Sequence, residues 1–299
     1  MFTFTNTHIL VEEFDYVEPE SPQEVTAALA EYGDQARLMA GGTDLLVQMK
    51  LERRSPTCVV GLRRVPSLRR VEYERGLEIG AAASVRRVGT AAVVRERYTA
   101  LAEACQAFST VQIMVMATVG GNLCNASPAA DTAPPLLAFD ARLRLVSPSM
   151  TREVPLDRFF TGPGRTVLAA AEFVESVWVP PPEGPTGSAF LKVGRVAADI
   201  SKVCVAVKLV REGARVRDCR VALGAVAPTP RRAVRAEAVL VEEPLTARVV
   251  EEAARLAREE IEPITDVRST AAYRRYVAGV LVQDGLRRAW ARAGGGDIQ

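Results

Sequence analysis

The sequence predicts an α+β protein with two domains, and three observations lead to this expectation. The chain has 299 residues, a length near which a single hydrophobic core stops growing efficiently. Strands alternate with helices in the first part, whereas in the last part a group of strands is followed by a group of helices. Between the two parts lie four prolines and two glycines, which exclude a helix or a central strand. We expect a first domain at 1–179 (parts about 1–60 and 61–179), a connector at 180–187, a second domain at 188–290 and a tail at 291–299.

The first elements have clear boundary signals. Residues 21–33 predict a helix, in which Ser21 is the N-cap, Pro22 lies in the first turn, Glu24 completes a capping box and Gly33 ends the helix. The segments that follow are a strand at 37–40, a glycine turn at 41–44, a helix at 45–50 and a buried strand at 57–62.

The middle and C-terminal segments are assigned from the spacing of their apolar residues. We expect a strand at 76–84 that ends at the possible N-cap Ser84, and a helix at 88–107 with Tyr98, Leu101, Ala104 and Cys105 on one face. A short helix ends near residue 140, and a strand follows at 142–146. The second domain is expected to contain strands at 203–210, 214–216 and 219–226, helices at 231–241, 245–260 and 270–292, and a frayed tail at 294–296.

Composition excludes several classes of function. The 38 Lys+Arg and 36 Asp+Glu residues nearly cancel, and the arginines are interleaved with acids, so the chain has no basic stripe for nucleic acid. His8 is the only histidine, so a catalytic triad, a histidine-rich zinc site or a histidine base would each need this one residue. We therefore expect the chain to act through a cofactor.

The five cysteines do not form a metal or disulfide pattern. No two of them form a C-x-x-C pair, so neither a zinc ribbon nor an iron–sulfur cluster is indicated, and their odd number argues against a disulfide framework. The sequence begins without a recognisable signal peptide, and no apolar run is long enough to span a membrane. These features favour a cytoplasmic protein.

Two glycine pairs carry the chemical information. The first, in Ala40-Gly41-Gly42-Thr43-Asp44-Leu45, lies between a strand and a helix, where the backbone can approach an anion and the first helical amides can bind it. It matches neither the dinucleotide fingerprint nor the Walker A loop, and taken alone it favours a plain structural turn.

The second pair lies in residues 117–131, beside Thr118 and among two asparagines, a serine and an aspartate. Many neutral hydrogen-bonding groups beside two glycines indicate a polar ligand. Together the two segments suggest two loops that hold the two phosphates of one pyrophosphate, although two unrelated turns remain an alternative.

In these two motifs the chain resembles the FAD-binding subunit of the molybdenum hydroxylases, a family that includes the medium subunits of carbon monoxide dehydrogenase and xanthine dehydrogenase. The resemblance extends over nearly the whole chain, through Lys192-Val193-Gly194-Arg195 and the segment 222–230. It implies a two-part FAD-binding domain of the vanillyl-alcohol-oxidase type, followed by a smaller α+β domain.

The resemblance implies noncovalent FAD with its pyrophosphate between residues 40–44 and 118–122. It places Asn125 and Asp131 near the ribityl and phosphate region and Lys192 near the flavin, although the spacing from Lys192 to Arg195 is one residue shorter than in the family. The expected cofactor contacts are Arg37, Leu38, Met39, Ala40, Gly41, Gly42, Thr43, Asp44, Leu45, Ala117, Thr118, Val119, Gly120, Gly121, Asn122, Cys124, Asn125, Asp131 and Lys192.

The same resemblance implies partners and a direction of electron flow. In the family, a molybdenum-cofactor large subunit oxidises the substrate, and a small subunit with [2Fe–2S] clusters relays electrons to FAD, which passes them to NAD⁺, a quinone or another acceptor. No side chain of this chain is expected to act as a catalytic acid or base, and no metal or iron–sulfur cluster is expected in it.

Two other hypotheses remain open. One is a stand-alone flavin-dependent NAD(P)H reductase, similar to enzymes that reduce the enolpyruvyl group of a cell-wall nucleotide sugar. The other is a flavin-free assembly scaffold, which the two intact motifs disfavour.

Overall fold

A three-stranded parallel sheet forms the N-terminal part of the computed structural model, which describes residues 10 and 12–298. His8 lies outside the described residues. Strand β3 (Cys58–Gly61) is buried between β1 (Asp15–Val17) and β2 (Ala36–Met39), and helices α1 (Pro22–Tyr32) and α2 (Leu45–Lys50) flank the sheet. The capping signals of α1 are confirmed, because the Ser21 hydroxyl accepts a hydrogen bond from the Glu24 amide at 3.3 Å.

An antiparallel five-stranded sheet, in the order β4–β5–β10–β6–β7, organises the next part of the chain. Its strands are β4 (Val71–Tyr73), β5 (Leu77–Gly80), β6 (Arg142–Val146), β7 (Thr151–Pro155) and β10 (Phe173–Val179). Six short helices accompany it in the chain: α3 (Val85–Thr90), α4 (Ala92–Arg97), α5 (Thr99–Gln106), α6 (Val111–Met116), α7 (Val119–Cys124) and α8 (Ala133–Ala138). A small hairpin joins β8 (Phe160–Gly162) and β9 (Arg165–Thr166). We propose that the first domain divides near residue 60, since β3 ends at Gly61 and the next sheet begins at Val71.

The prediction of a single helix at 88–107 is wrong, because the chain forms the three helices α3, α4 and α5 over residues 85–106. The backbone leaves the helical region at Ala91 (ψ 129°) and again at Tyr98 (φ −127°). These breaks allow α3 to lie across α5, where a Cβ atom added at Gly89 would stand 2.5 Å from the Cβ of Cys105. The face expected from the spacing is nevertheless buried, at Tyr98, Leu101, Ala104 and Cys105.

The last part contains an antiparallel sheet in the order β11–β12–β13–β14 and three helices. The strands are β11 (Thr186–Val193), β12 (Val203–Glu212), β13 (Arg215–Gly224) and β14 (Arg231–Arg232), and the helices are α9 (Val234–Ala238), α10 (Ala247–Glu259) and α11 (Ala271–Arg292). The runs expected as two strands at 214–226 form the single strand β13. Residues 231–232 are strand rather than helix, since the Glu237 carboxylate accepts bonds from the Arg232 guanidinium and the Val221 amide (both 2.9 Å).

Both ends of this part differ from the expected boundaries. Thr186 and Gly187, assigned to the connector, begin β11, and Gly187 packs so closely under α11 that an added Cβ would stand 1.9 Å from the Ala289 carbonyl oxygen. The helix α11 continues to Arg292, and the glycines after it are held rather than frayed, because the Trp290 indole donates to the Gly296 carbonyl at 3.0 Å.

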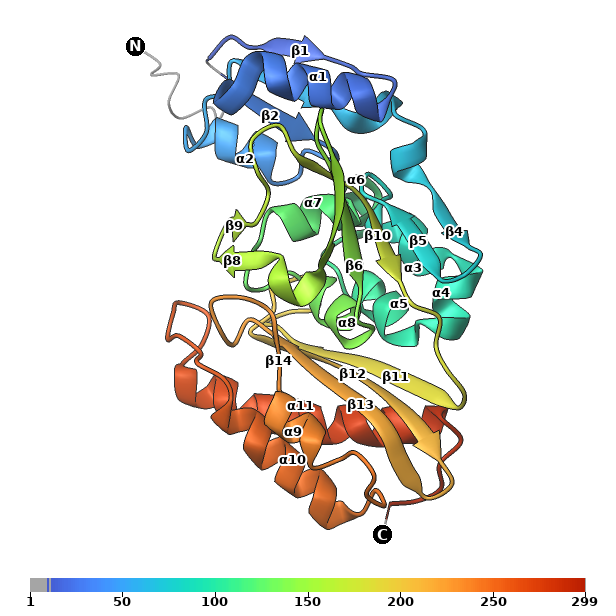
Figure 1. Ribbon diagram of the computed structural model, residues 1–299. Helices are drawn as coiled ribbons and strands as arrows, with labels where there is room; N and C mark the ends of the chain where they lie inside the picture. Colours follow the sequence, from blue (N-terminus) through green and yellow to red (C-terminus); the bar gives the residue numbers. More distant parts are fainter. Residues whose placement is uncertain (1–9, 11, 299) are drawn as a thin grey trace.

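The C-terminal sheet is covered on both faces (Figure 1). One face packs against α10 and α11, and the other meets α5 and α8, so that Phe190, Cys204, Ala206 and Ala222 belong to the core of the preceding part. The contact is also polar, because the Phe190 amide donates to the Glu103 carboxylate at 2.8 Å. This sheet therefore supports α5, α8 and the end of the second segment, whose Pro128 carbonyl accepts a hydrogen bond from the Ala225 amide at 2.7 Å.

Candidate functional site

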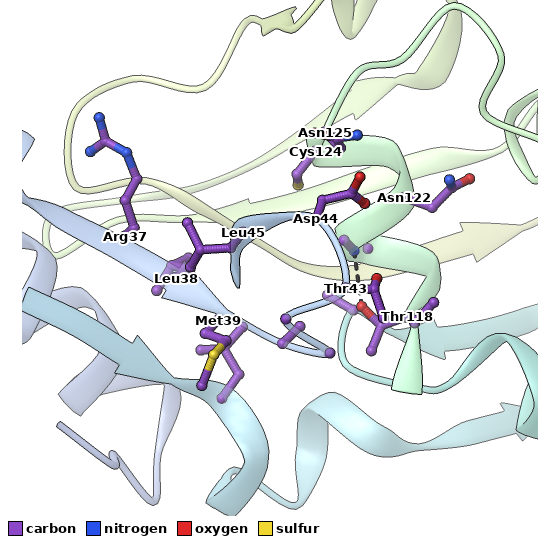
Figure 2. A pocket seen from close by; sticks show the side chains of 18 of the residues that line it. Arg37, Leu38, Met39, Thr43, Asp44, Leu45, Thr118, Asn122, Cys124 and Asn125 are labelled. Atoms are coloured by element: carbon purple, nitrogen blue, oxygen red, sulfur yellow. Dashed lines mark hydrogen bonds between the residues drawn. The ribbon is translucent and has the colours of Figure 1, made fainter. Parts of the chain in front are cut away.

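A cavity of about 350 Å³ lies where the loop between β2 and α2 meets α7. Its lining includes every residue of 37–45 and, from the second segment, Ala117, Thr118, Gly120, Gly121, Asn122, Cys124 and Asn125. Figure 2 shows the two segments meeting, with Thr43 close to Thr118 and with Asn122, Cys124 and Asn125 along α7. The sequence motifs thus converge on one cavity.

Glycine permits this convergence at Gly41. A Cβ atom at this position would stand 1.9 Å from the Met116 carbonyl oxygen, so the two backbones touch only because no side chain separates them. A second link joins the helices, since the Gln48 side-chain amide donates to Asn125 Oδ1 at 3.3 Å. The loop and α7 are therefore held together on one wall of the cavity.

The first segment offers unpaired backbone donors. The first helical bond of α2 runs from the Leu46 amide to the Gly42 carbonyl at 3.0 Å, and the amides of residues 41–45 donate no hydrogen bond within the part of the chain that the structure describes. Successive free amides beside a cavity, at the start of a helix, fit the oxygen atoms of a phosphate group. The donor set of this segment therefore suits the pyrophosphate of FAD.

The second segment does not form the loop that we expected from its glycines. Thr118 caps the helix α7, its hydroxyl accepting the Gly121 amide at 3.0 Å, and the Gly120 amide donates to the Ala81 carbonyl at 3.0 Å. Both glycines lie in the first turn, and Gly120 allows close packing on Ala81, 2.5 Å from a hypothetical Cβ. These two amides are already used, so α7 supplies side chains and surface to the cavity rather than free amide donors.

Three of the expected cofactor residues do not line the cavity. Val119 is buried in α7. Asp131 and Lys192 form a buried ion pair, with 2.6 Å between Lys192 Nζ and Asp131 Oδ2, and Ser201 donates to the other carboxylate oxygen at 2.5 Å. Burial raises the pKa of Asp131, and the ammonium and hydroxyl groups oppose that rise. The pair connects the segment after α7 to β11.

The side chains around the cavity have uneven charge. Burial raises the pKa of Asp44, whose side chain makes no capping bond to α2, while Arg37 and Arg54 supply positive charge to the lining. Cys124 remains a neutral thiol, because burial raises its pKa to about 12.

Sequence reasoning missed a further group of lining residues. They come from separate elements and belong to no motif: Gln48, Arg54, Leu62, Ala81, Phe108, Gly164, Leu168, Phe173 and Val174. Only Gly164 has a local signal, a positive φ of 67° in the β8–β9 turn, and that signal indicates a turn rather than a ligand. No helix in the described residues is long and apolar enough to cross a membrane.

Comparison with known proteins agrees with this fold and cavity. The family model described as FAD binding domain in molybdopterin dehydrogenase matches residues 12–182, and the CO dehydrogenase flavoprotein C-terminal domain matches 188–289. The carbon monoxide dehydrogenase medium chain of Hydrogenophaga pseudoflava is 33% identical over 93% of this chain and 98% of its own length. The xanthine dehydrogenase FAD-binding subunit of Escherichia coli O157:H7 is 31% identical over 87% of this chain and 91% of its own.

Solved structures show the same likeness. The carbon monoxide dehydrogenase from Hydrogenophaga pseudoflava that lacks the Mo-pyranopterin moiety aligns with a TM-score of 0.92 and 34% identity, covering 95% of this chain and 99% of the other. Quinoline 2-oxidoreductase from Pseudomonas putida 86 aligns with a TM-score of 0.87 and 29% identity, covering 94% and 98%.

Fold and cavity together define a flavin-binding oxidoreductase subunit. The chain belongs to the family of FAD-binding subunits of the molybdopterin dehydrogenases. The expected fold class, family and cofactor are confirmed.

Proposed function

We propose that this chain is the electron-transfer subunit of a molybdenum hydroxylase complex, taking electrons from the [2Fe–2S] clusters of a small subunit and passing them to NAD⁺, a quinone or another acceptor. The observation that carries the proposal is the cavity at which both glycine motifs meet, with unpaired amides on one wall. Bound FAD accepts electrons singly and delivers them in pairs, which is the chemistry such a relay needs.

The residues of the chain then have separate tasks. The amides of residues 41–45 and the Thr43 hydroxyl bind the phosphate oxygens, and each charge-assisted bond contributes about 1.5–3 kcal/mol. On α7, Asn122 is fixed by the Thr132 hydroxyl, which donates to its side-chain carbonyl at 2.7 Å, so its amide group is available to the ligand. Asp131 and Lys192 act as positioning residues, because they lie behind the lining.

FAD is held noncovalently in this proposal. Among the residues that the structure describes, the cavity lining contains no histidine or tyrosine, and its one thiol there, Cys124, stays protonated. The five cysteines, all free, suit a reducing cytoplasm, and we place the protein there. The molybdenum subunit would hold the substrate site, so the substrate of the complex is a property of that partner.

Reconstitution tests the proposal. The purified chain should bind one FAD, with a rise in melting temperature, and the flavin should be reduced when a reduced [2Fe–2S] small subunit is added. A chain that binds no FAD but joins the complex would be a scaffold. If the isolated flavoprotein turns over NAD(P)H with an enolpyruvyl nucleotide sugar, the stand-alone reductase is the correct reading instead.

A further inference from the structure

Helix α7 meets the cavity with two asparagine side chains, while its glycine amides are already in use. The Gly120 and Gly121 amides donate hydrogen bonds within the protein. Asn122 and Asn125 both line the cavity, and because they lie three residues apart they share one face of the helix. A side-chain amide carries an acceptor oxygen and a donor nitrogen, so each asparagine can offer either group to a ligand.

The oxygen of Asn122 is occupied by Thr132. Asn122 Oδ1 accepts the Thr132 hydroxyl at 2.7 Å and the Thr132 backbone amide at 3.4 Å. A backbone amide can only donate, so the oxygen of Asn122, and not its nitrogen, must face Thr132. The side-chain nitrogen donates no hydrogen bond within the part of the chain that the structure describes. Asn122 therefore keeps its two N–H donors for the cavity.

Asn125 is arranged in the same way by a different residue. Gln48 on α2 donates from its side-chain nitrogen to Asn125 Oδ1 at 3.3 Å, and the Asn125 nitrogen has no acceptor among the described residues. Two separate partners thus occupy the oxygens of the two asparagines and leave the donors. FAD carries acceptor oxygens along its pyrophosphate and ribityl chain, and an asparagine oxygen facing them would repel them.

We propose that Thr132 and Gln48 are positioning residues, which hold the side-chain amides of Asn122 and Asn125 with their N–H groups toward FAD; the inference rests on the proposed placement of FAD in the cavity. The asparagine donors replace the backbone amides that α7 uses for its own cap and packing. Without its partner, either amide can turn by 180° and present its oxygen to the acceptor atoms of FAD.

Thr132 is well placed for this role. It is fully buried and does not line the cavity, so it reaches FAD only through Asn122. The preceding residue, Asp131, forms the buried ion pair with Lys192 on β11 at 2.6 Å. Two consecutive side chains therefore fasten this short segment to β11 and to α7. The hydroxyl has a defined position before FAD binds, which lowers the entropic cost of ordering the site.

Removal of the Thr132 hydroxyl tests the inference. Valine has the shape of threonine without the hydroxyl, so Thr132→Val removes the donor, whereas Thr132→Ser keeps it. Thr26→Val is the matched control, since Thr26 is also buried and its hydroxyl donates to the Gln23 carbonyl at 2.9 Å in α1, outside the cavity lining. FAD affinity is measured by flavin-fluorescence titration of the apoprotein, and folding by melting temperature.

The expected loss depends on the hydroxyl and on Asn122. Thr132→Val should bind FAD about 3- to 10-fold more weakly, the change that corresponds to one hydrogen bond. Thr132→Ser and Thr26→Val should bind FAD within about twofold of the wild type. Asn122→Ala removes the amide that Thr132 holds, so adding Thr132→Val to this variant should cause no further loss of affinity.

Gln48→Met gives the same test at the second asparagine, and it applies even if Thr132→Val folds poorly. Methionine has a similar length but no donor, so FAD affinity should fall by about the same factor, and it should fall no further in an Asn125→Ala background. Gln48 itself lines the cavity. Additive losses in the double variant would therefore show that Gln48 contacts FAD directly and would remove its positioning role.

Three outcomes would overturn the inference for Thr132. Wild-type affinity in Thr132→Val would mean that the hydroxyl does not hold Asn122 for FAD. An equal loss in Thr132→Ser would assign the effect to packing of the methyl group. An equal loss in the Asn122→Ala background would show that Thr132 does not act through Asn122. If the wild-type chain itself binds no FAD, the proposed function fails, which is a different result from any of these.

Discussion

Replacement of Gly121 by alanine separates ligand binding from folding better than any other glycine substitution in the site. The only described atom within 4 Å of an added Cβ is Thr118 Oγ1, at 2.8 Å, and Gly121 lines the cavity. The new methyl group therefore enters space meant for the ligand. By contrast, valine at Gly42 would be strained whatever the ligand, because φ there is 72°, so loss of FAD in Gly42→Val would not identify a contact.

The effects of Gly121→Ala on stability should nearly cancel. Displacing Thr118 Oγ1 weakens the N-cap of α7, at a cost of about 1 kcal/mol. Alanine inside a helix is favoured over glycine by about the same amount. In the complex, the methyl group interferes with a polar contact worth about 1.5–3 kcal/mol, which corresponds to roughly 10- to 150-fold weaker FAD binding.

The assay is a flavin-fluorescence titration of the apoprotein combined with thermal unfolding. Gly296→Ala serves as the matched control, since nothing lies within 4 Å of a Cβ there and the residue is outside the cavity. We expect an unchanged apoprotein melting temperature and at least tenfold weaker FAD binding in Gly121→Ala alone. FAD affinity within twofold of the wild type would refute the placement of the ligand against α7.

Three other substitutions test the supporting structure. Lys192→Met leaves the Asp131 carboxylate buried without its partner and should cost about 3–5 kcal/mol in urea unfolding. Glu172→Gln should cost about 1–3 kcal/mol at neutral pH, since two hydrogen bonds from Arg152 lower the pKa of Glu172. That stabilisation is present above the unfolded-state pKa of about 4.3 and is lost as the pH falls through the lower folded-state pKa, so the difference between variant and wild type should shrink only in more acidic solution. Gly41→Ala forces a methyl group against backbone 1.9 Å away and should lower both the melting temperature and FAD content.

Each of these has an outcome that would contradict it. A second substitution, Asp131→Asn, should restore part of the stability lost in Lys192→Met, and no recovery would mean that the lysine acts through packing rather than charge. A stability difference for Glu172→Gln that is constant from neutral to acid pH would show that the carboxylate is not the source. Normal melting of Gly41→Ala would mean that the two backbones can separate.

The sequence predicted the features of the site that depend on neighbouring residues. The caps of α1 and the strand–turn–helix around Gly41 follow from residues within one turn of each other. The three-helix arrangement of 85–106 could not be predicted in this way, because Gly89 meets Cys105 only after the chain has folded. For the same reason no sequence motif predicted that Phe108 and Leu168 would line the cavity.

The two glycine pairs show most clearly what local sequence cannot predict, since the same Gly-Gly sequence has a different physical role in each pair. In the first pair the absence of a side chain brings two backbones together and leaves amides unpaired. In the second pair Thr118 and Ala81 take the amides, and glycine serves helix packing and access to the cavity. A glycine pair in the sequence indicates that the backbone lies close to another group. Whether that group is a ligand or another segment of the chain depends on the tertiary structure.

Contacts of β11 argue that the two matched regions are one folding unit with respect to the cofactor. Removal of the chain after residue 182 would take away Lys192, the counter-ion of buried Asp131, and Phe190, whose ring lies in the core beneath α5 and α8. It would also release the Glu103 carboxylate from the Phe190 amide. The truncation would also uncover the apolar surface of α5 and α8 on which the sheet packs, and each Å² of apolar surface left in water costs about 25 cal/mol. The FAD-binding region alone should therefore be unstable, although the cavity lining itself contains no residue beyond Val174.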